Sequence, residues 1–389
     1  MRSPTEDRAG VFRSRRARTM SAMQEKVLVV GAGIAGLAAG RALAGRGTDV
    51  EIVERHGAPQ TEGMGLYLPA NAVRVLDGLG LSGPLSDSAQ AIAWQQIRDR
   101  SGHVLADYAA DAVWGEVGEC LAITRADLHG ILLDGVDVRF GTAVRTVDPD
   151  GTVSFADGAT ARYDLVVAAD GINSVVRRAV FPRTQPTFLG QVCWRLVTEV
   201  TGVAAESPHT WTAMLGSRGR SLLVVPLGGG RAYVYASIDS DTPEEPSGSW
   251  RDLFADFGEP AVGVLSGDAP AHFAALHEIS GDDWVRDRVV LIGDAAHACS
   301  PSMAQGGALA LEDAVVLAEL LGGVDDAGRI PGLLERYRER RSPRVRFVMA
   351  QNHRRDRARN LPALARKLLF RHAGLRMVQA NHAKLRELP

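Results

Sequence analysis

The chain has 389 residues, of which 46% are hydrophobic and 23% charged, so it can bury one large core or two smaller ones. Its 44 Lys and Arg residues against 46 Asp and Glu residues give a net charge of −2, which excludes a global attraction to nucleic acid or anionic membranes. Three widely spaced cysteines form no CxxC pair, and this usage is typical of a protein in a reducing cytoplasm.

The first 25 residues contain six arginines but no apolar segment of the kind that a secretory or twin-arginine signal requires. We expect residues 1–25 to be a disordered tail, with Met20 or Met23 as an alternative start. An Arg-rich organellar transit peptide stays open, although acids such as Glu6 and Asp7 are unusual for one. The apolar run 27–40 has 14 residues with four glycines, too short to span a bilayer. We therefore expect a cytoplasmic protein without a membrane span.

The stretch "KVLVVGAGIAGLAAGRALAGRGTDVEIVER" predicts a buried strand, a tight turn, a helix and a second strand. Its turn fits GxGxxG through Gly31, Gly33 and Gly36, which permit a tight turn, approach of a pyrophosphate and close helix packing. Glu54 follows the second strand, where its carboxylate can accept hydrogen bonds from a ribose. The unit predicts an NAD or FAD site; a glycine-rich turn in an unrelated α/β protein is the alternative.

Further along the chain, short alternating segments predict strands between residues 90 and 165, and residues 182–286 are also rich in β-forming segments. Two buried strands, in 164–171 and 288–297, each run into a loop that carries an acid beside glycine. A long helix begins near Gly307, and the remainder is helical and rich in arginine.

These elements predict an α/β fold in which a Rossmann-like nucleotide-binding domain is assembled from separated pieces around an inserted β-sheet domain. The expected boundaries are 26–90, 115–181 and 286–345 for the nucleotide-binding domain, 91–114 and 182–285 for the β-sheet domain, and 346–389 for C-terminal helices.

Two later motifs distinguish FAD from NAD. "DLVVAADGINSVVR" (164–177) and "GDAAHACSP" (293–301) resemble the D-x-x-x-x-A-D-G-x-x-S-x-V-R and G-D-A-A-H-x-x-x-P patterns of the class A flavoprotein monooxygenases, which include para-hydroxybenzoate and salicylate hydroxylases. "ITRADL" (123–128) resembles the family segment whose arginine contacts FAD, and "GMGLYLPANAVRVLDGLGL" (63–81) resembles the loop and helix that flank the flavin. The motifs occur in family order across residues 26–345.

The resemblance implies a GR2-type FAD-binding domain with an inserted substrate-binding sheet. It implies non-covalent FAD, since no His or Cys lies in a recognised flavinylation context, and a transient NAD(P)H co-substrate, since the chain has a single GxGxxG. The implied cofactor contacts are Gly31, Gly33, Ala35 and Gly36 at the diphosphate, Glu54 and Arg55 at the adenosine, Gly65, Arg125, Asp294, Pro301, Gly306 and Gly307 at the flavin and its ribityl chain, and Asp170 with Gly171 near both FAD and NAD(P)H.

The residues "AQGG" (304–307) lie where a helix begins, and general physical chemistry suggests a function for them without reference to the family. Gly306 and Gly307 expose backbone N–H groups where a helix begins, and a reduced flavin carries negative charge over N1 and the C2 carbonyl. A helix N-terminus aimed at that charge stabilises it by about 0.3–2 kcal/mol from the dipole alone, and N–H hydrogen bonds act as in an oxyanion hole. A plain helix that starts with glycine is the alternative.

"QVCWRLV" (191–197) places Arg195 in the middle of a half-buried strand, where a charge is costly unless it is paired. The family often has Trp-Arg here, with the arginine near substrate and flavin, so Arg195 is the candidate catalytic residue; a structural ion pair is the alternative. Strand residues Trp211, Met214, Tyr233 and Tyr235, together with Pro301, are expected to line the substrate pocket, with an ordinary core role as the alternative for each strand residue.

Two other patterns suggest chemistry that we do not expect. His297 and Cys299 lie near Asp294 in "IGDAAHACSP", but one short loop lacks a fourth ligand for structural zinc, so we expect no metal site and ordinary packing for both. Residues 335–359 hold ten arginines against three acids, without the interleaved aromatics of a nucleic-acid surface. We expect a solvated helix face that covers the flavin domain, and no nucleic-acid partner.

The resemblance thus predicts an FAD-dependent, NAD(P)H-using monooxygenase that hydroxylates a small aromatic or heteroaromatic substrate with O₂ through a flavin C4a-hydroperoxide, as a monomer or homodimer. Epoxidation by the same intermediate is a variant within the family. A flavin-dependent reductase or dehydrogenase that does not use O₂, and a non-catalytic flavin-binding protein, are the alternatives from other classes.

Overall fold

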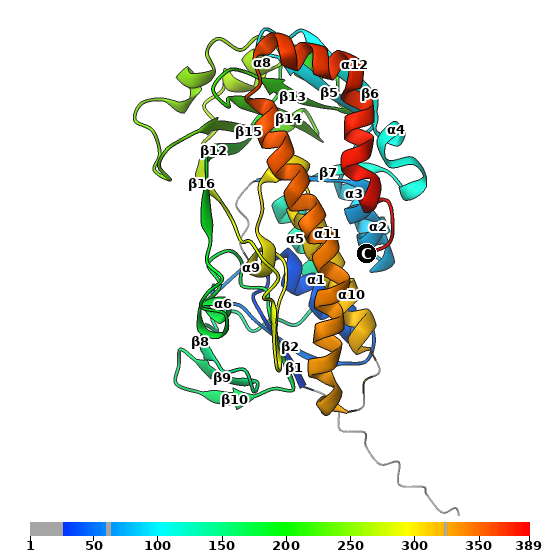
Figure 1. The fold of residues 1–389 in the computed structure, drawn as a ribbon, viewed down its shortest axis with the longest axis vertical. Coiled ribbons are helices and arrows are strands. Elements are labelled where there is room, and N and C mark those ends of the chain that lie inside the picture. The colour runs from blue at the N-terminus through cyan, green and yellow to red at the C-terminus, as the bar shows by residue number, and fades with distance from the viewer. Residues whose placement is uncertain (1–25, 60–63, 323, 325) are drawn as a thin grey trace, which may run out of the picture.

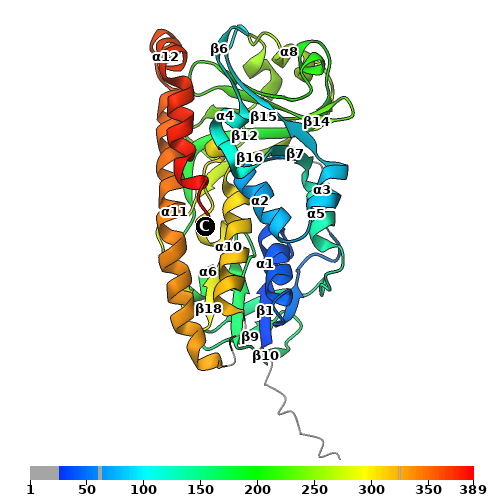
Figure 2. The ribbon, with the colours of Figure 1, turned by 90° about the vertical axis from the view of Figure 1, so that its right-hand side faces the viewer.

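The computed structural model describes residues 26–59, 64–322, 324 and 326–389. The tail expected at 1–25, and Gly63 at the start of the flavin-flanking segment, lie outside the described residues. Two larger sheets lie toward opposite ends of the molecule, and a long helix runs along one side past both of them (Figures 1 and 2).

The sheet that carries the GxGxxG turn has five strands in the order β17-β18-β11-β1-β2. Its parallel strands are β1 (Lys26–Val30), β2 (Asp49–Val53), β11 (Leu165–Ala168) and β18 (Val289–Leu291), and β17 (Val285–Arg286) is antiparallel to β18. The three central strands are almost wholly buried, as expected for a parallel sheet covered on both faces. Helix α1 (Ile34–Ala44) follows β1 and packs against α10 (Gly306–Leu321).

The second large sheet has seven strands in the order β16-β12-β15-β14-β13-β5-β6. Their bounds are β5 (Trp94–Asp99), β6 (Val104–Ala109), β12 (Thr187–Glu199), β13 (Thr210–Leu215), β14 (Ser221–Gly228), β15 (Arg231–Asp239) and β16 (His272–Glu278). One face of this sheet packs on a core that includes Trp194, Trp250 and Phe254. Since side chains alternate along a strand, the intervening residues project from the opposite face.

Two three-stranded sheets complete the β structure. One is β3 (Gly65–Leu68), β7 (Cys120–Thr124) and β4 (Gln90–Ile92) in the order β3-β7-β4; the other is β8 (Val144–Val147), β9 (Thr152–Phe155) and β10 (Thr160–Arg162) in the order β10-β9-β8. The smaller helices are α2 (Ala70–Gly78), α3 (Ser82–Ser88), α4 (Ala110–Trp114), α5 (Arg125–Leu133), α6 (Val175–Val180), α7 (Val203–Glu206), α8 (Ala261–Leu265) and α9 (Asp294–His297).

The C-terminal part consists of α11 (Ile330–Arg359) and α12 (Ala363–His382). Helix α11 continues through position 345/346, where the sequence analysis places a domain boundary, so no break in the backbone marks that position. Helix α12 turns back beside α11 at the end of the molecule that holds the seven-stranded sheet (Figures 1 and 2). In the part of the chain that the structure describes, no helix combines the length and apolar character needed to cross a membrane.

Candidate active site

A cavity of about 850 Å³ is lined by residues of the seven-stranded sheet, of β3, of the loops that follow β1, β11 and β18, and of the C-terminal helices. It brings together most of the site residues that the sequence analysis selects from distant parts of the chain. Those on its lining are Gly33, Ala35, Gly65, Arg125, Pro301, Asp294, Gly306, Gly307, Arg195, Trp211, Tyr233 and Tyr235.

In the turn between β1 and α1, the backbone is crowded at Gly31 and Gly36 but open at Gly33, where a phosphate is expected. Gly31 has φ +101°, and a Cβ there would lie 2.6 Å from the Ala169 carbonyl oxygen. A Cβ on Gly36 would lie 1.9 Å from the Gly31 oxygen, whereas one on Gly33 would meet nothing within 4 Å. No side chain caps the N-terminus of α1 at Gly33. An open turn at an uncapped helix N-terminus fits the diphosphate of a dinucleotide.

At the end of β2, the carboxylate of Glu54 is half-buried and ordered by hydrogen bonds. It accepts them from the backbone N–H groups of Ala32, at 2.9 Å, and His56, at 3.0 Å. Burial opposes ionisation, but these hydrogen bonds outweigh it and lower the pKa of Glu54. Arg55 is exposed and does not line the cavity. An ionised acceptor beside the turn fits a ribose hydroxyl.

The loop after β18 places a carboxylate next to a helix N-terminus. Asp294 begins α9 and lines the cavity, and a Cβ on Gly306 would lie 4.0 Å from its Oδ1 atom. Helix α10 begins at Gly306 without a side-chain cap. Uncapped N–H groups beside an acid suit the hydroxyls and the carbonyl of a ribityl-flavin. These observations fit FAD between the turn at Gly33 and the N-terminus of α10, both of which line the cavity, whereas Glu54 lies outside its lining.

Asp170 and Gly171, expected near FAD and NAD(P)H, differ in their relation to the cavity. Asp170 does not line the cavity; its Oδ2 atom accepts hydrogen bonds from the N–H groups of Val175, at 2.7 Å, and Val176, at 3.3 Å, at the start of α6. Burial raises the pKa of Asp170, and its Oδ1 atom has no partner in the described chain. Asp170 Oδ2 thus caps the start of α6, while Gly171 lines the cavity.

Arg195 lies on β12 with its side chain toward the cavity. It is half-buried, its Nε atom is buried without a hydrogen-bond partner, and it forms no ion pair with any described residue. The alternative of a structural ion pair therefore has no support in the described chain. The guanidinium is available to an anionic or carbonyl oxygen of a ligand.

Three expected aromatic side chains line the same cavity as Arg195, and one of the strand residues expected there does not. Trp211, Tyr233 and Tyr235 line the cavity, and the indole Nε1 atom of Trp211 is buried without a partner. Met214 is fully buried in the core on the other face of the seven-stranded sheet. It is an odd number of residues from Trp211 on β13, so strand alternation directs it away from the cavity.

His297 and Cys299 are not a reactive pair. His297 Nε2 lies 2.6 Å from Asp313 Oδ2, which also accepts a hydrogen bond from the Gly293 N–H at 2.9 Å. Burial raises the pKa of the Cys299 thiol to about 12, so it stays protonated at neutral pH. His297 does more than pack, because through Asp313 it helps to fix the residue that precedes Asp294. No described group of His, Cys, Asp and Glu is arranged to hold a metal.

The arginines of α11 are expected from the sequence to form a solvated face, but some of them are buried. Arg341 is fully buried: its guanidinium donates to Asp313 Oδ1, at 2.8 Å, and to Glu312 Oε2, at 2.9 Å. Arg344 donates to both oxygens of Glu312, and Asn71 donates to Glu312 Oε1 at 2.9 Å. Burial opposes the ionisation of Asp313, but its cationic partners outweigh it and lower the pKa. These pairs fasten α11 and α2 to α10, the helix that begins at Gly306.

The C-terminal helices supply cavity residues that sequence reasoning missed. They include Arg355, Arg359, Met377, Asn381 and His382. Arg-rich segments are normally solvated, so only the tertiary fold reveals that this end of α11 turns inward. The spacing of Phe370, Met377 and Val378 on one side of α12 was the available signal.

His382 is a source of acid sensitivity. Burial lowers its pKa from 6.5 to about 4, so the unfolded chain binds the proton more tightly than the folded one. We expect the contribution of neutral His382 to the free energy of unfolding to be fully present above pH 6.5. The free energy of unfolding should then fall by about 2–3 kcal/mol as the pH approaches 4. Urea unfolding of the wild type and of His382→Gln across this range measures the effect.

The exposed His372→Gln on the same helix is the matched control. It should keep the wild-type pH dependence, whereas His382→Gln should flatten it. Equal slopes for all three proteins would contradict this origin of the acid sensitivity.

Comparison with known proteins agrees with this geometry. A family model described as an FAD binding domain matches residues 24–352. The 2-heptyl-3-hydroxy-4(1H)-quinolone synthase of Pseudomonas aeruginosa is 33% identical over 344 residues, covering 84% of this chain and 87% of that protein. The 3-amino-4-hydroxybenzoate 2-monooxygenase of Streptomyces cremeus is 33% identical over 348 residues, covering 85% and 86%.

Among solved structures, Klebsiella pneumoniae HpxO complexed with FAD and uric acid superposes with a TM-score of 0.81 at 28% identity, covering 93% of this chain and 96% of that one. A salicylate hydroxylase substrate complex gives 0.75 at 26% identity, covering 94% and 98%. The chain therefore belongs to the FAD-binding family of class A flavoprotein monooxygenases. The expected α/β fold, the FAD cofactor and the assignment as an FAD-dependent oxidoreductase are confirmed.

Proposed function

We propose that the protein uses NAD(P)H and O₂ to hydroxylate a small aromatic or heteroaromatic compound, with non-covalently bound FAD. The observation that carries the proposal is the single cavity in which the turn of α1 and the N-terminus of α10 meet Arg195 and its aromatic neighbours. The flavin, when bound, supplies reductive activation of O₂ and delivery of one oxygen atom.

In this proposal the chain's own residues bind, orient and exclude water. Gly33 and Glu54 hold the dinucleotide, while Asp294 and the N-terminus of α10 hold the flavin and stabilise negative charge on it. Arg195 orients an oxygen of the substrate, and Trp211 and Tyr235 enclose its ring. Relatives named for a quinolone, an aminohydroxybenzoate and, in HpxO, uric acid support a planar substrate that carries a hydroxyl or carbonyl group on its ring.

A panel of such compounds tests the proposal. The expected result is faster NADH or NADPH oxidation with one compound, which gains one oxygen atom from isotopically labelled O₂. Anaerobic reduction of the compound without oxygen incorporation would instead identify a reductase. Failure of both nicotinamides to bleach the flavin with any compound would favour a flavin-binding protein without catalysis.

Asp294 provides a test of the flavin contacts. Asp294→Ala removes an acceptor for a ribityl hydroxyl, and we expect FAD to bind about tenfold more weakly. His297→Ala, on the same loop, should leave the flavin content per folded molecule largely unchanged, although it lowers stability through Asp313. Flavin absorbance after gel filtration measures both. The reverse order of flavin loss would contradict the assignment of Asp294.

A further inference from the structure

Helix α12 has an exposed side on which leucines project into solvent. Leu364 is 71% exposed, Leu368 52% and Leu375 39%. Spacings of four and seven residues put them in one stripe along the helix. Single exposed leucines are ordinary, but a row of them on one helix indicates a surface that another phase or molecule covers.

Basic side chains flank this stripe. Lys367, Arg371 and Arg376 are exposed and form no ion pair with any described residue. The helix contains no Asp or Glu between residues 363 and 382. Acids on the elements packed against it include Asp107 of β6, Asp111 of α4 and Asp356 of α11, and none of them makes an ion pair with it. We call these three leucines and three basic residues the α12 outer face.

We propose that the α12 outer face docks on an anionic lipid bilayer, with the leucines in the interface and the basic groups at lipid phosphates. Apolar residues bordered by Lys and Arg are the pattern of helices that lie in a membrane surface. Each such cation favours anionic lipid, and the attraction falls with salt. The chain's overall charge of −2 makes this a local property of one helix.

Charge favours a bilayer over the other occupants of such a face. In a two-fold dimer the same patch would meet itself and set the basic groups of one copy against those of the other, with no acid of α12 between them. A nucleic acid would satisfy the basic groups but would leave the leucines in water. The proposal goes beyond hydroxylation and does not depend on which compound is hydroxylated.

The position of α12 connects this surface to the cavity. Its inner side carries Phe370, Met377 and Val378, which line the cavity. Helix α12 itself lies at the edge of the molecule (Figure 2). Docking would therefore bring one wall of the cavity against the bilayer.

Vesicle flotation of the FAD-loaded full-length protein tests the proposal. We expect binding to vesicles of phosphatidylcholine with phosphatidylglycerol, little binding to phosphatidylcholine alone, and weakening with added salt. The variants Lys367→Gln/Arg371→Gln and Leu364→Ser/Leu368→Ser should each lower the partition coefficient about tenfold or more. The charge-matched control Arg145→Gln/Arg336→Gln and the exposed Val262→Ser should leave it unchanged.

Flavin content and thermal midpoint, measured on every variant, separate loss of docking from loss of folding. The proposal is overturned if the wild type binds neither vesicle, or if α12 variants and controls bind equally. A dimer in light scattering that the leucine variant dissociates, without vesicle binding, would identify a second copy as the occupant. Because flotation needs no substrate, the result is independent of the proposed function.

Discussion

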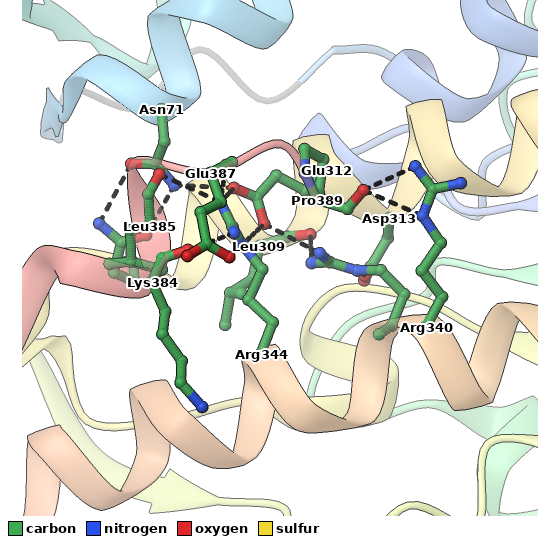
Figure 3. A network of polar contacts seen from close by, with 12 residues as sticks. Asn71, Leu309, Glu312, Asp313, Arg340, Arg344, Lys384, Leu385, Glu387 and Pro389 are labelled. Carbon is green, nitrogen blue, oxygen red and sulfur yellow. Dashed lines mark hydrogen bonds and ion pairs between the residues drawn. The ribbon is translucent and has the colours of Figure 1, made fainter. Parts of the chain in front are cut away.

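Replacing Arg341 by alanine should lower the free energy of unfolding by about 3–5 kcal/mol, because it leaves buried carboxylates without their cation. Arg341 joins Glu312 and Asp313, and all three side chains are fully buried. Hydrogen bonds from Asn71 and Arg344 to Glu312 cannot replace the contact to Asp313 (Figure 3). Guanidinium-chloride unfolding measures the change. If the variant is too unstable to purify, the loss of stability is larger than expected but has the same direction.

Arg338→Ala is the matched control on the same helix. Its partly exposed guanidinium pairs with Glu335 at 2.8 Å, an arrangement worth about 1 kcal/mol or less. A small effect at Arg338 with a large one at Arg341 would confirm that burial and pairing, rather than the arginine-rich composition of α11, hold the helix in place. Similar midpoints for the two variants would contradict this account.

Replacing Arg195 by glutamine should lower kcat/KM for the best substrate about 100-fold or more, which is the scale for one preorganised charged donor in a site that excludes water. Its guanidinium faces the cavity without an ion-pair partner in the described chain. Flavin content and thermal midpoint should stay at wild-type values, because no described carboxylate loses a partner.

Arg98→Gln serves as the control, because Arg98 lies on β5 of the same sheet but does not line the cavity. We expect its kcat/KM to match the wild type. Titration of each variant with substrate, followed by flavin absorbance, separates weaker binding from slower turnover. An unchanged kcat/KM for Arg195→Gln would remove Arg195 from the catalytic machinery.

Short-range patterns predicted the nucleotide-binding elements well. The buried strand, glycine turn and helix at 27–44 are confirmed, since steric demands at Gly31 and Gly36 operate over a few residues. Gly65 is a partial case: it lines the cavity, but its backbone also lies against Tyr233, whose Cβ would be 2.2 Å from an added Cβ. That contact joins distant segments, so no local pattern reports it.

Predictions that depended on long-range geometry did less well. The pattern of residues 210–215 identified a strand, but it did not show which of the two alternating sets of side chains faces the cavity. Met214 was therefore wrongly placed beside Trp211. The arginines of α11 looked solvated because their partners, Glu312 and Asp313, lie on another helix. Burial of a charge depends on partners that only the fold brings together.

Helix α11 contacts elements at both ends of the molecule. Near its middle, Arg341 holds α10 beside the five-stranded sheet; at its end, Arg359 pairs with Asp239 of β15, at 2.6 Å, in the seven-stranded sheet. One helix therefore contacts both halves of the molecule, so the seven-stranded sheet, which lines the cavity, is tied through α11 to the helix that begins at Gly306.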